Sequence, residues 1–344
     1  MTRTYPLAER TDVVDDMHGH KVMDPYRWLE DADDARTREW SDQQSAQLEH
    51  ERESWSTRDT FAESVQALLG AGAVSLPVHR SERVFFTQRQ PGQQFGVLFV
   101  READGSERVL LDPMELDPTG STTLDAWQPS KGGERLAYQV SEGGTEESVL
   151  YVMDVATGEV IDGPIDRCRY SPVAWIPGGE RFYYVRSLPA ELLPESERGF
   201  HRRVFLHTVG ADAAKDANVF GAGMTITNYY GVEVSRDGRW LQVSAAEGTE
   251  PRNDLWVADL TTPPADRPAF QQVQVDVDAQ TSLTFGRDGR VFVSTDLEAP
   301  RGKLAVTEPG QWGSSQWVDL VAEDPEAVLE SVAILDGPDL DEDL

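Results

Sequence analysis

The chain has 344 residues, of which 61 are acidic and 31 basic, so its formal net charge at pH 7 is −30. A surface this negative repels nucleic acid and anionic membranes, and we expect neither as a partner. Cys168 is the only cysteine. A single cysteine excludes an internal disulfide and a multi-cysteine metal site, and it indicates a reducing compartment.

The sequence shows neither a targeting signal nor a membrane span. Residues 1–20 carry acidic and basic side chains without the apolar stretch that a secretory signal requires. The longest apolar runs, such as residues 95–100, are far too short to cross a bilayer. We therefore predict a cytoplasmic protein.

Residues 1–72 are predicted to form an N-terminal extended and helical segment. Residues 33–69 contain no Pro or Gly and are rich in Glu, Gln, Arg and Ala, which favours helix. The stretch 54–57 is expected to divide this region into two helices, and Gly70 to end the second. The apolar positions are Trp40, Leu48, Trp55, Phe61, Val65 and Leu68. This segment is too short to form its own core, so its apolar face needs a partner.

From residue 73 onward, a short apolar strand core recurs at nearly constant spacing. The cores begin at positions 98, 150, 205, 255 and 304. A period near 50 residues with several strands per repeat is typical of a β-propeller.

Each core from the second to the fifth is preceded by a glycine-containing turn and an alternating strand. The turns are Gly132-Gly133, Gly178-Gly179, Asp237-Gly238 and Asp288-Gly289. Such dipeptides supply the positive φ of a tight hairpin, and alternation places one face of a strand inward. We predict an all-β fold in residues 73–335, an incomplete propeller of five four-stranded blades and a partial sixth. Residues 316–321 would complete the fifth blade and 328–335 begin the sixth, before an acidic tail at 336–344.

Residues 24–31 read Asp-Pro-Tyr-Arg-Trp-Leu-Glu-Asp. This motif resembles the N-terminal signature of the prolyl oligopeptidase family of serine peptidases. Its surroundings agree, with Tyr5-Pro6 and Arg10 upstream. The segments 111–117 and 201–220 are similar to the family's first blade connection and third-blade strand. The resemblance covers the N-terminal extension and the propeller, which is essentially the whole chain.

The resemblance implies a seven-bladed propeller that caps a C-terminal α/β-hydrolase domain with a Ser-Asp-His triad. It also implies hydrolysis of short peptides after proline, with the propeller restricting access to small substrates. The N-terminal extension would pack largely on the hydrolase domain. Short proline-containing peptides are thus the expected partners.

The sequence departs from the family where catalysis would lie. No Gly-x-Ser-x-Gly occurs, so the sharp turn that exposes a nucleophilic serine is missing. No doubly wound βαβ pattern occurs either. We therefore expect the hydrolase domain to be absent and assign no catalytic, cofactor-binding or metal-binding residue, and no cofactor.

The candidates for such sites have simpler explanations. His18 and His20 form a His-x-His pair, but a metal site needs a third ligand and a supporting second shell. His207 lies inside a strand core, which favours a hydrogen-bonded structural residue over a catalytic base. Cys168 stands between Arg167 and Arg169, which would favour a reactive thiol, yet a buried cysteine is the preferred interpretation.

Acidic pairs such as Asp33-Asp34 are expected from composition alone in a chain with 61 acids. The tail 339–343 lacks the glycine and spaced glutamate of a calcium loop. The turn at 142–144 lacks the lysine and helix of a phosphate-binding loop.

Two hypotheses remain open. The chain is a truncated or split member of the family that is inactive alone, and its catalytic residues are either encoded elsewhere, on a separate hydrolase half that complements it, or lost. Alternatively it is a non-enzymatic propeller scaffold or a decayed peptidase that binds a protein or peptide, or self-associates through open blade edges. A glycosidase-like propeller enzyme is a weaker third possibility, which the motif at 24–31 disfavours.

Overall fold

The computed structural model describes residues 5–262 and 265–334, and the chain divides into two compact units, residues 1–71 and 72–344. The first unit begins with a hairpin of β1 (Val14–Met17) and β2 (His20–Met23). A 3₁₀ turn, η1 (Arg27–Glu30), follows. Two helices, α1 (Ala35–Arg52) and α2 (Arg58–Leu69), complete the unit.

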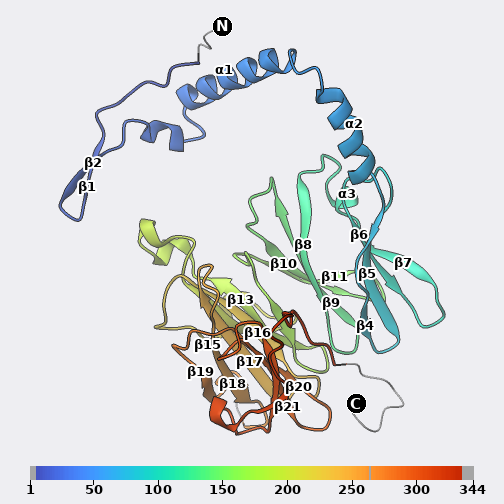
Figure 1. Ribbon diagram of the computed structural model, residues 1–344. Coiled ribbons are helices and arrows are strands. Elements are labelled where there is room, and N and C mark those ends of the chain that lie inside the picture. The colour runs from blue at the N-terminus through green and yellow to red at the C-terminus, as the bar shows by residue number, and fades with distance from the viewer. Residues whose placement is uncertain (1–4, 263–264, 335–344) are drawn as a thin grey trace. The chain divides into compact units, whose positions relative to one another are not determined.

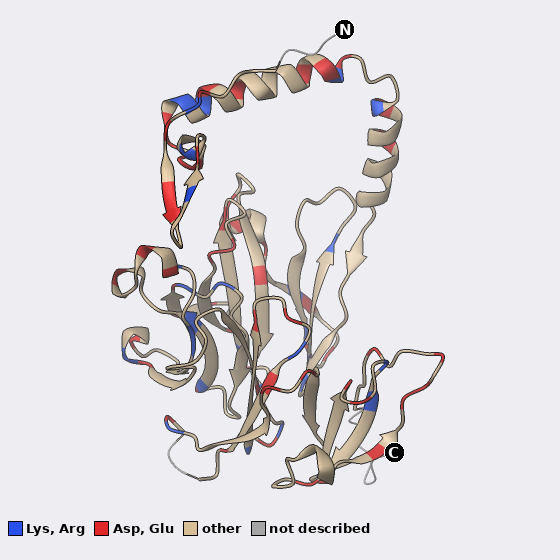
Figure 2. Cartoon of the chain, turned by 60° about the vertical axis from the view of Figure 1, so that its left-hand side comes forward, with Lys and Arg blue, Asp and Glu red and all other residues tan. Residues whose placement is uncertain are grey.

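The predicted division into two helices is confirmed. Asp34 caps α1, because its side chain accepts a hydrogen bond from the backbone N–H of Arg36. Figure 2 shows acidic and basic residues interspersed along α1. None of the described residues 5–71 is buried. On α2, Phe61, Val65 and Leu68 share a helix face and are 67%, 50% and 78% exposed. This unit therefore has an apolar face but no core of its own.

The described part of the second unit forms five antiparallel sheets, many of whose strands are labelled in Figure 1, and this confirms the predicted propeller blades. Blade 1 contains β3 (Ala73–Val74), β4 (Val78–Arg80), β5 (Arg83–Arg89), β6 (Val97–Arg101) and β7 (Glu107–Leu111). It has five strands because β3 and β4 both pair with β5. A one-turn helix, α3 (Pro113–Leu116), leads to blade 2.

Blades 2 to 5 are four-stranded, with the strands side by side in chain order. Blade 2 contains β8 (Thr122–Pro129), β9 (Arg135–Glu142), β10 (Val149–Asp154) and β11 (Val160–Ile165). Blade 3 contains β12 (Val173–Trp175), β13 (Arg181–Ser187), β14 (Arg202–Thr208) and β15 (Ala217–Phe220). Blade 4 contains β16 (Asn228–Val234), β17 (Trp240–Glu247), β18 (Asp254–Asp259) and β19 (Phe270–Gln274). Blade 5 contains β20 (Thr281–Phe285), β21 (Val291–Thr295), β22 (Lys303–Thr307) and β23 (Val318–Val321).

Short 3₁₀ turns lie in the connections of blades 3 and 5. They are η2 (Ala190–Leu192), η3 (Glu195–Glu197), η4 (Ala213–Lys215) and η5 (Ser314–Gln316).

The core lies between the blades. Each of four hydrophobic clusters joins one blade to the next, so the two faces of an inner blade belong to different clusters. Along β13, Phe182 and Tyr184 pack toward blade 2, whereas Tyr183 and Val185 pack toward blade 4. The two-residue period of the sequence thus reflects burial on both faces of each sheet.

The segment expected to begin a sixth blade differs from the prediction. Its described residues, 328–334, contain no strand. Instead the backbone N–H of Leu329 donates to the carbonyl of Arg301 at 2.8 Å, beside Gly302. A strand needs a run of backbone hydrogen bonds to a neighbouring strand, and none of the described strands pairs with residues 328–334.

Candidate functional site

The first strands of blades 2, 3 and 4 line a cavity in the propeller. β12 contacts both β8 and β16, so these first strands lie beside one another. We call the space that the first strands of the blades line the channel. A cavity of about 370 Å³ opens between them, and its lining includes Arg80 at the end of β4. Residues from four blades therefore line one cavity.

The glycine-containing turns set the spacing of the blades at this end of the channel. Gly133 has φ +82° and lies against Arg80, because a Cβ atom built there would come within 3.1 Å of the Arg80 carbonyl oxygen. Gly238 has φ +78° and lies against Pro177 of the preceding blade, which a Cβ would meet at 2.6 Å. Only glycine tolerates both this backbone and this approach. Each of these turns thus nests against the turn of the blade before it.

Lys131 extends from the turn of blade 2 to blade 4. Its Nζ donates a hydrogen bond to the carbonyl oxygen of Val234 at 2.7 Å. Burial and the nearby Arg80 lower the pKa of Lys131. Burial also lowers the pKa of Arg80, with a smaller contribution from Arg236. The lining of the cavity therefore includes two partly desolvated cations that repel each other.

A carboxyl group faces the same cavity. Burial raises the pKa of Glu233 above its usual value, and the charge of Lys131 opposes this shift only partly. A second and larger cavity, about 770 Å³, lies between blades 4 and 5. There the side chain of Gln242 accepts a hydrogen bond from the backbone N–H of Leu283 at 3.2 Å, which ties the two blades together.

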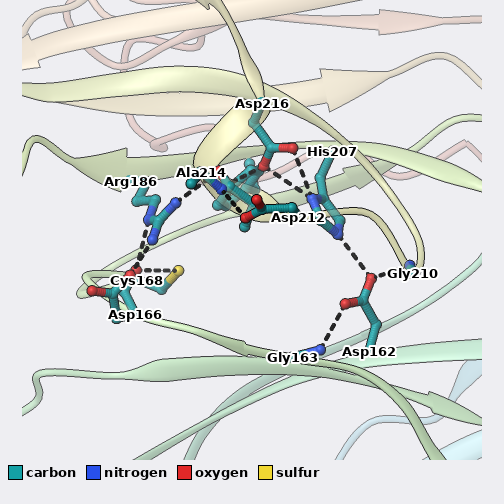
Figure 3. Close-up of polar contacts among 12 residues, drawn as sticks. Asp162, Gly163, Asp166, Cys168, Arg186, His207, Gly210, Asp212, Ala214 and Asp216 are labelled. Carbon is teal, nitrogen blue, oxygen red and sulfur yellow. Dashed lines mark hydrogen bonds and ion pairs between the residues drawn. The ribbon is translucent and has the colours of Figure 1, made fainter.

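A buried polar cluster joins blades 2 and 3 away from these cavities (Figure 3). The ring of His207, on β14, is fully buried. Its Nδ1 lies 2.9 Å from both carboxylate oxygens of Asp216, and its Nε2 lies 2.8 Å from Oδ2 of Asp162 on β11. Tyr184 donates to Asp216 at 2.7 Å, and the backbone N–H of Gly210 donates to Asp162 at 2.5 Å. Every polar atom of the imidazole thus has a partner inside the fold.

Comparison with protein families matches residues 5–337 to "Prolyl oligopeptidase, N-terminal beta-propeller domain". The match includes the motif at 24–31 and all five blades. The chain belongs to the prolyl oligopeptidase family.

Relatives in the family agree with this assignment. The prolyl endopeptidase of Elizabethkingia meningoseptica is 27% identical over 323 residues, which cover 94% of this chain and 45% of that protein. The prolyl oligopeptidase A of Amanita bisporigera is 24% identical over 365 residues, covering 96% of this chain and 47% of that protein. The chain thus spans about half the length of the curated relatives it matches.

Solved structures match in the same way. A chain from a structural and mechanistic study of two prolyl endopeptidases superimposes with a TM-score of 0.85 and 29% identity. That superposition covers 96% of this chain and 48% of the other. Prolyl oligopeptidase B of Galerina marginata superimposes with a TM-score of 0.80 at 21% identity, covering 96% of this chain and 49% of that one, a likeness in fold.

In this member of the family, the hydrogen bonds of residues 5–262 and 265–334 include none between a serine hydroxyl and a histidine ring. His201 pairs with Glu197 at 2.5 Å, and His207 with aspartates only. The assignment of no catalytic residue stays a prediction.

The His-x-His pair lies on the exposed hairpin of the first unit. His18 lies in the turn and His20 begins β2, and Asp16 there pairs with Lys21 at 2.9 Å and accepts from the N–H of Gly19. Asp15 and Asp24 both bind the guanidinium of Arg27. No group of three metal-binding side chains occurs among the residues described. The acids near the pair are thus occupied by cations of the chain itself.

Cys168 is fully buried between blades 2 and 3. Burial raises the pKa of its thiol to about 12. The flanking Arg167 pairs with Asp166 at 3.0 Å. A high pKa and no access to solvent oppose the alternative of a reactive thiol. The tail at 339–343, the other candidate, lies outside the described residues.

Sequence reasoning missed the charged end of the channel. Arg80, Lys131 and Glu233 were not singled out, although a signal exists. A basic residue directly follows the first turn residue in blades 2, 4 and 5, at Lys131, Arg236 and Arg287. A repeated position of this kind indicates a ring of cations, but only the folded blades show which of them face one cavity.

No helix among the described residues is long and apolar enough to cross a membrane.

Proposed function

We propose that this chain is the substrate-filtering propeller of a proline-directed oligopeptidase and does not catalyse hydrolysis by itself. The observation that carries the proposal is the match of residues 5–337 to the family's N-terminal propeller domain. Two of the relatives that match this chain are named prolyl endopeptidase and prolyl oligopeptidase A. Acyl transfer needs a nucleophile, a base and an oxyanion hole held together. The triad would belong to an α/β-hydrolase domain on a separate polypeptide or further along the gene.

The apolar face of the first unit supports a partner of this kind. Phe61, Val65 and Leu68 expose a continuous strip of α2. Exposed apolar strips of this kind mark surfaces that bind another protein or domain. The hydrolase half is the partner that we propose for this strip. Short proline-containing peptides are the proposed substrates, and the single buried thiol of Cys168 supports a reducing, cytoplasmic location.

The first experiment is a peptidase assay of the purified 344-residue chain with a Gly-Pro-linked chromogenic peptide. We expect no turnover above the buffer rate. Turnover that a serine-directed reagent blocks would overturn the proposal.

A second arm adds the separately expressed hydrolase half of the Elizabethkingia meningoseptica relative. We expect activity on short peptides to appear, with a lower rate on peptides of about 40 residues, because the propeller limits access. Equal rates on short and long peptides would contradict the filtering role.

A binding scaffold that self-associates is the second candidate function. All four residues of β23, the edge strand of blade 5, are exposed, and Val318, Leu320 and Val321 are apolar. Unpaired apolar edge strands pair with other chains unless they are covered. Size-exclusion chromatography with light scattering tests this candidate. A concentration-dependent dimer that Leu320→Lys abolishes would favour the scaffold, and a monodisperse monomer would count against it.

A further inference from the structure

Two cations that line the 370 Å³ cavity, Arg80 and Lys131, form no ion pair with the residues that the structure describes. Among the described residues, the hydrogen bonds of Lys131 and Arg80 go to backbone carbonyls, those of Val234 and His79, at 2.7 and 2.8 Å. This is unusual in a chain with 61 acids and 31 basic residues, where most arginines lie beside a carboxylate. Net negative charge thus surrounds a cavity whose own end is positive.

One nitrogen of the Arg80 guanidinium has no hydrogen-bond partner among the described residues. This atom, Nε, is also buried. A buried donor without a partner has lost its hydrogen bond to water, so such groups are uncommon unless a ligand satisfies them. Arg80 lines the 370 Å³ cavity together with Lys131. A ligand in that cavity that accepts hydrogen bonds would satisfy the Arg80 donor.

The groups around this pair do not neutralise it. Glu233 is the carboxyl group in the cavity lining, and burial raises its pKa, which disfavours its charged form. Arg236 adds a further positive charge nearby, and Asp237 a weaker negative one. Burial is the main cause that lowers the pKa of each cation, and for Lys131 the repulsion from Arg80 adds to this shift while the charge of Glu233 opposes it.

We propose that this end of the channel binds the C-terminal carboxylate of a short peptide. The guanidinium of Arg80 and the ammonium of Lys131 hold the carboxylate, and the cavity walls hold the last one or two side chains. The choice of a peptide as the ligand rests on the proposed function, whereas the anion site rests on the geometry of Arg80 and Lys131.

The shape and chemistry of the cavity favour a peptide end over other anions. Trp127, Trp175 and Pro172 supply apolar walls, which suit a prolyl or aliphatic residue next to the carboxylate. About 370 Å³ lies at the small end of the roughly 300–1,000 Å³ typical of ligand pockets, so the site takes a peptide terminus and no polymer. The net charge of −30 repels polyanions such as nucleic acid. A planar carboxylate matches the guanidinium fork.

Binding to the chain itself tests the site without any catalysis. Isothermal titration calorimetry compares Ala-Gly-Pro with a free carboxylate against the same peptide with a C-terminal amide, and against acetate alone. We expect the acid to bind about tenfold more tightly than the amide, because one charge-assisted contact is lost. A higher salt concentration should weaken the binding of the acid and leave the affinity for the amide unchanged. Equal affinity of acid and amide, or acetate binding as tightly as the peptide, would overturn the proposal.

Variants locate the site. Arg80→Gln and Lys131→Gln should each remove most of the preference for the acid. Lys215→Gln is the matched control, because Lys215 is 81% exposed and pairs with Asp212 on the outside of blade 3. Circular dichroism shows whether each variant is folded. If a variant is unfolded, the comparison of acid and amide binding to the unchanged chain still tests the proposal. An unchanged preference in both folded cavity variants would also refute the site. Absent peptidase activity bears only on the proposed function, so the two failures are distinguishable.

Discussion

The Nε2 atom of His207 lies 2.8 Å from Oδ2 of Asp162, and this contact joins the last strand of blade 2 to the third strand of blade 3. Asp216 holds the other ring nitrogen at 2.9 Å. Carboxylate oxygens accept hydrogen bonds, so the ring can donate from both nitrogens only as the imidazolium ion. Two blades are therefore joined through a buried charge on one side chain.

The first prediction concerns pH. Burial opposes the charge of His207, but the hydrogen bonds with Asp216 and Asp162 outweigh it, and the pKa is raised. A pKa raised in the folded state adds stability that is complete below the ordinary histidine value of about 6.5 and is lost as the pH rises through the folded value. We expect the melting temperature to fall between pH 6 and pH 9, and to fall less in His207→Gln.

The matched control for this prediction is His50→Gln, because the His50 side chain is 82% exposed. It should follow the unchanged protein at every pH. His207→Gln should also lower the unfolding free energy by about 3 kcal/mol at pH 6, since removing one partner of a buried charged cluster leaves the other charges buried without compensation. Parallel pH curves for the His207 variant and the unchanged protein would refute a protonated imidazole. Thermal unfolding followed by circular dichroism provides both results.

The second prediction compares two turn glycines. Gly238→Ala puts a Cβ within 2.6 Å of Pro177 at φ +78°, so it combines backbone strain with a clash between blades. Gly289→Ala, at φ +84° in the equivalent turn of blade 5, has nothing within 4 Å. We expect the free energy of unfolding to fall by about 1 kcal/mol in Gly289→Ala and by about 3 kcal/mol in Gly238→Ala, as measured by urea unfolding. Equal costs would show that Pro177 moves aside freely.

The third prediction concerns the single thiol. Cys168 is fully buried and burial raises its pKa to about 12, so it should not react with a disulfide reagent in the native protein at pH 8. In denaturant, one equivalent should react within minutes. The same assay on Cys168→Ser provides the blank. Rapid native labelling at a rate independent of unfolding would contradict the buried position.

The fourth prediction separates the two units. Leu68→Ser removes an apolar side chain that is 78% exposed, and we expect a change within about 0.5 kcal/mol in the isolated chain. Leu241→Ala, in the cluster between blades 3 and 4, should cost about 3 kcal/mol. With the hydrolase half added, Leu68→Ser should weaken association at least several-fold. Normal association of this variant would remove α2 from the proposed interface.

Short-range patterns along the chain were sufficient to predict its repeating unit. The Asp-Gly and Gly-Gly turns and the two-residue alternation act between near neighbours, so they define hairpins wherever they occur. The two helices also follow from interactions between near neighbours in the sequence, since Asp34 caps α1 and the stretch around Ser54 separates α1 from α2. The motif at 24–31 then indicated the family. These features depend on residues within a few positions of one another.

Contacts between blades depended on the fold. Asp162 and His207 are 45 residues apart, and Lys131 and Val234 are 103 apart. Alternation says that a strand has two faces, but it does not say which neighbouring blade each face meets. The same holds for residues 328–334, whose β-propensity produced no strand because pairing requires a second chain segment beside it. Tertiary packing alone placed Arg80 and Lys131 at one cavity, because charges on different blades converge only once the sheets are arranged side by side.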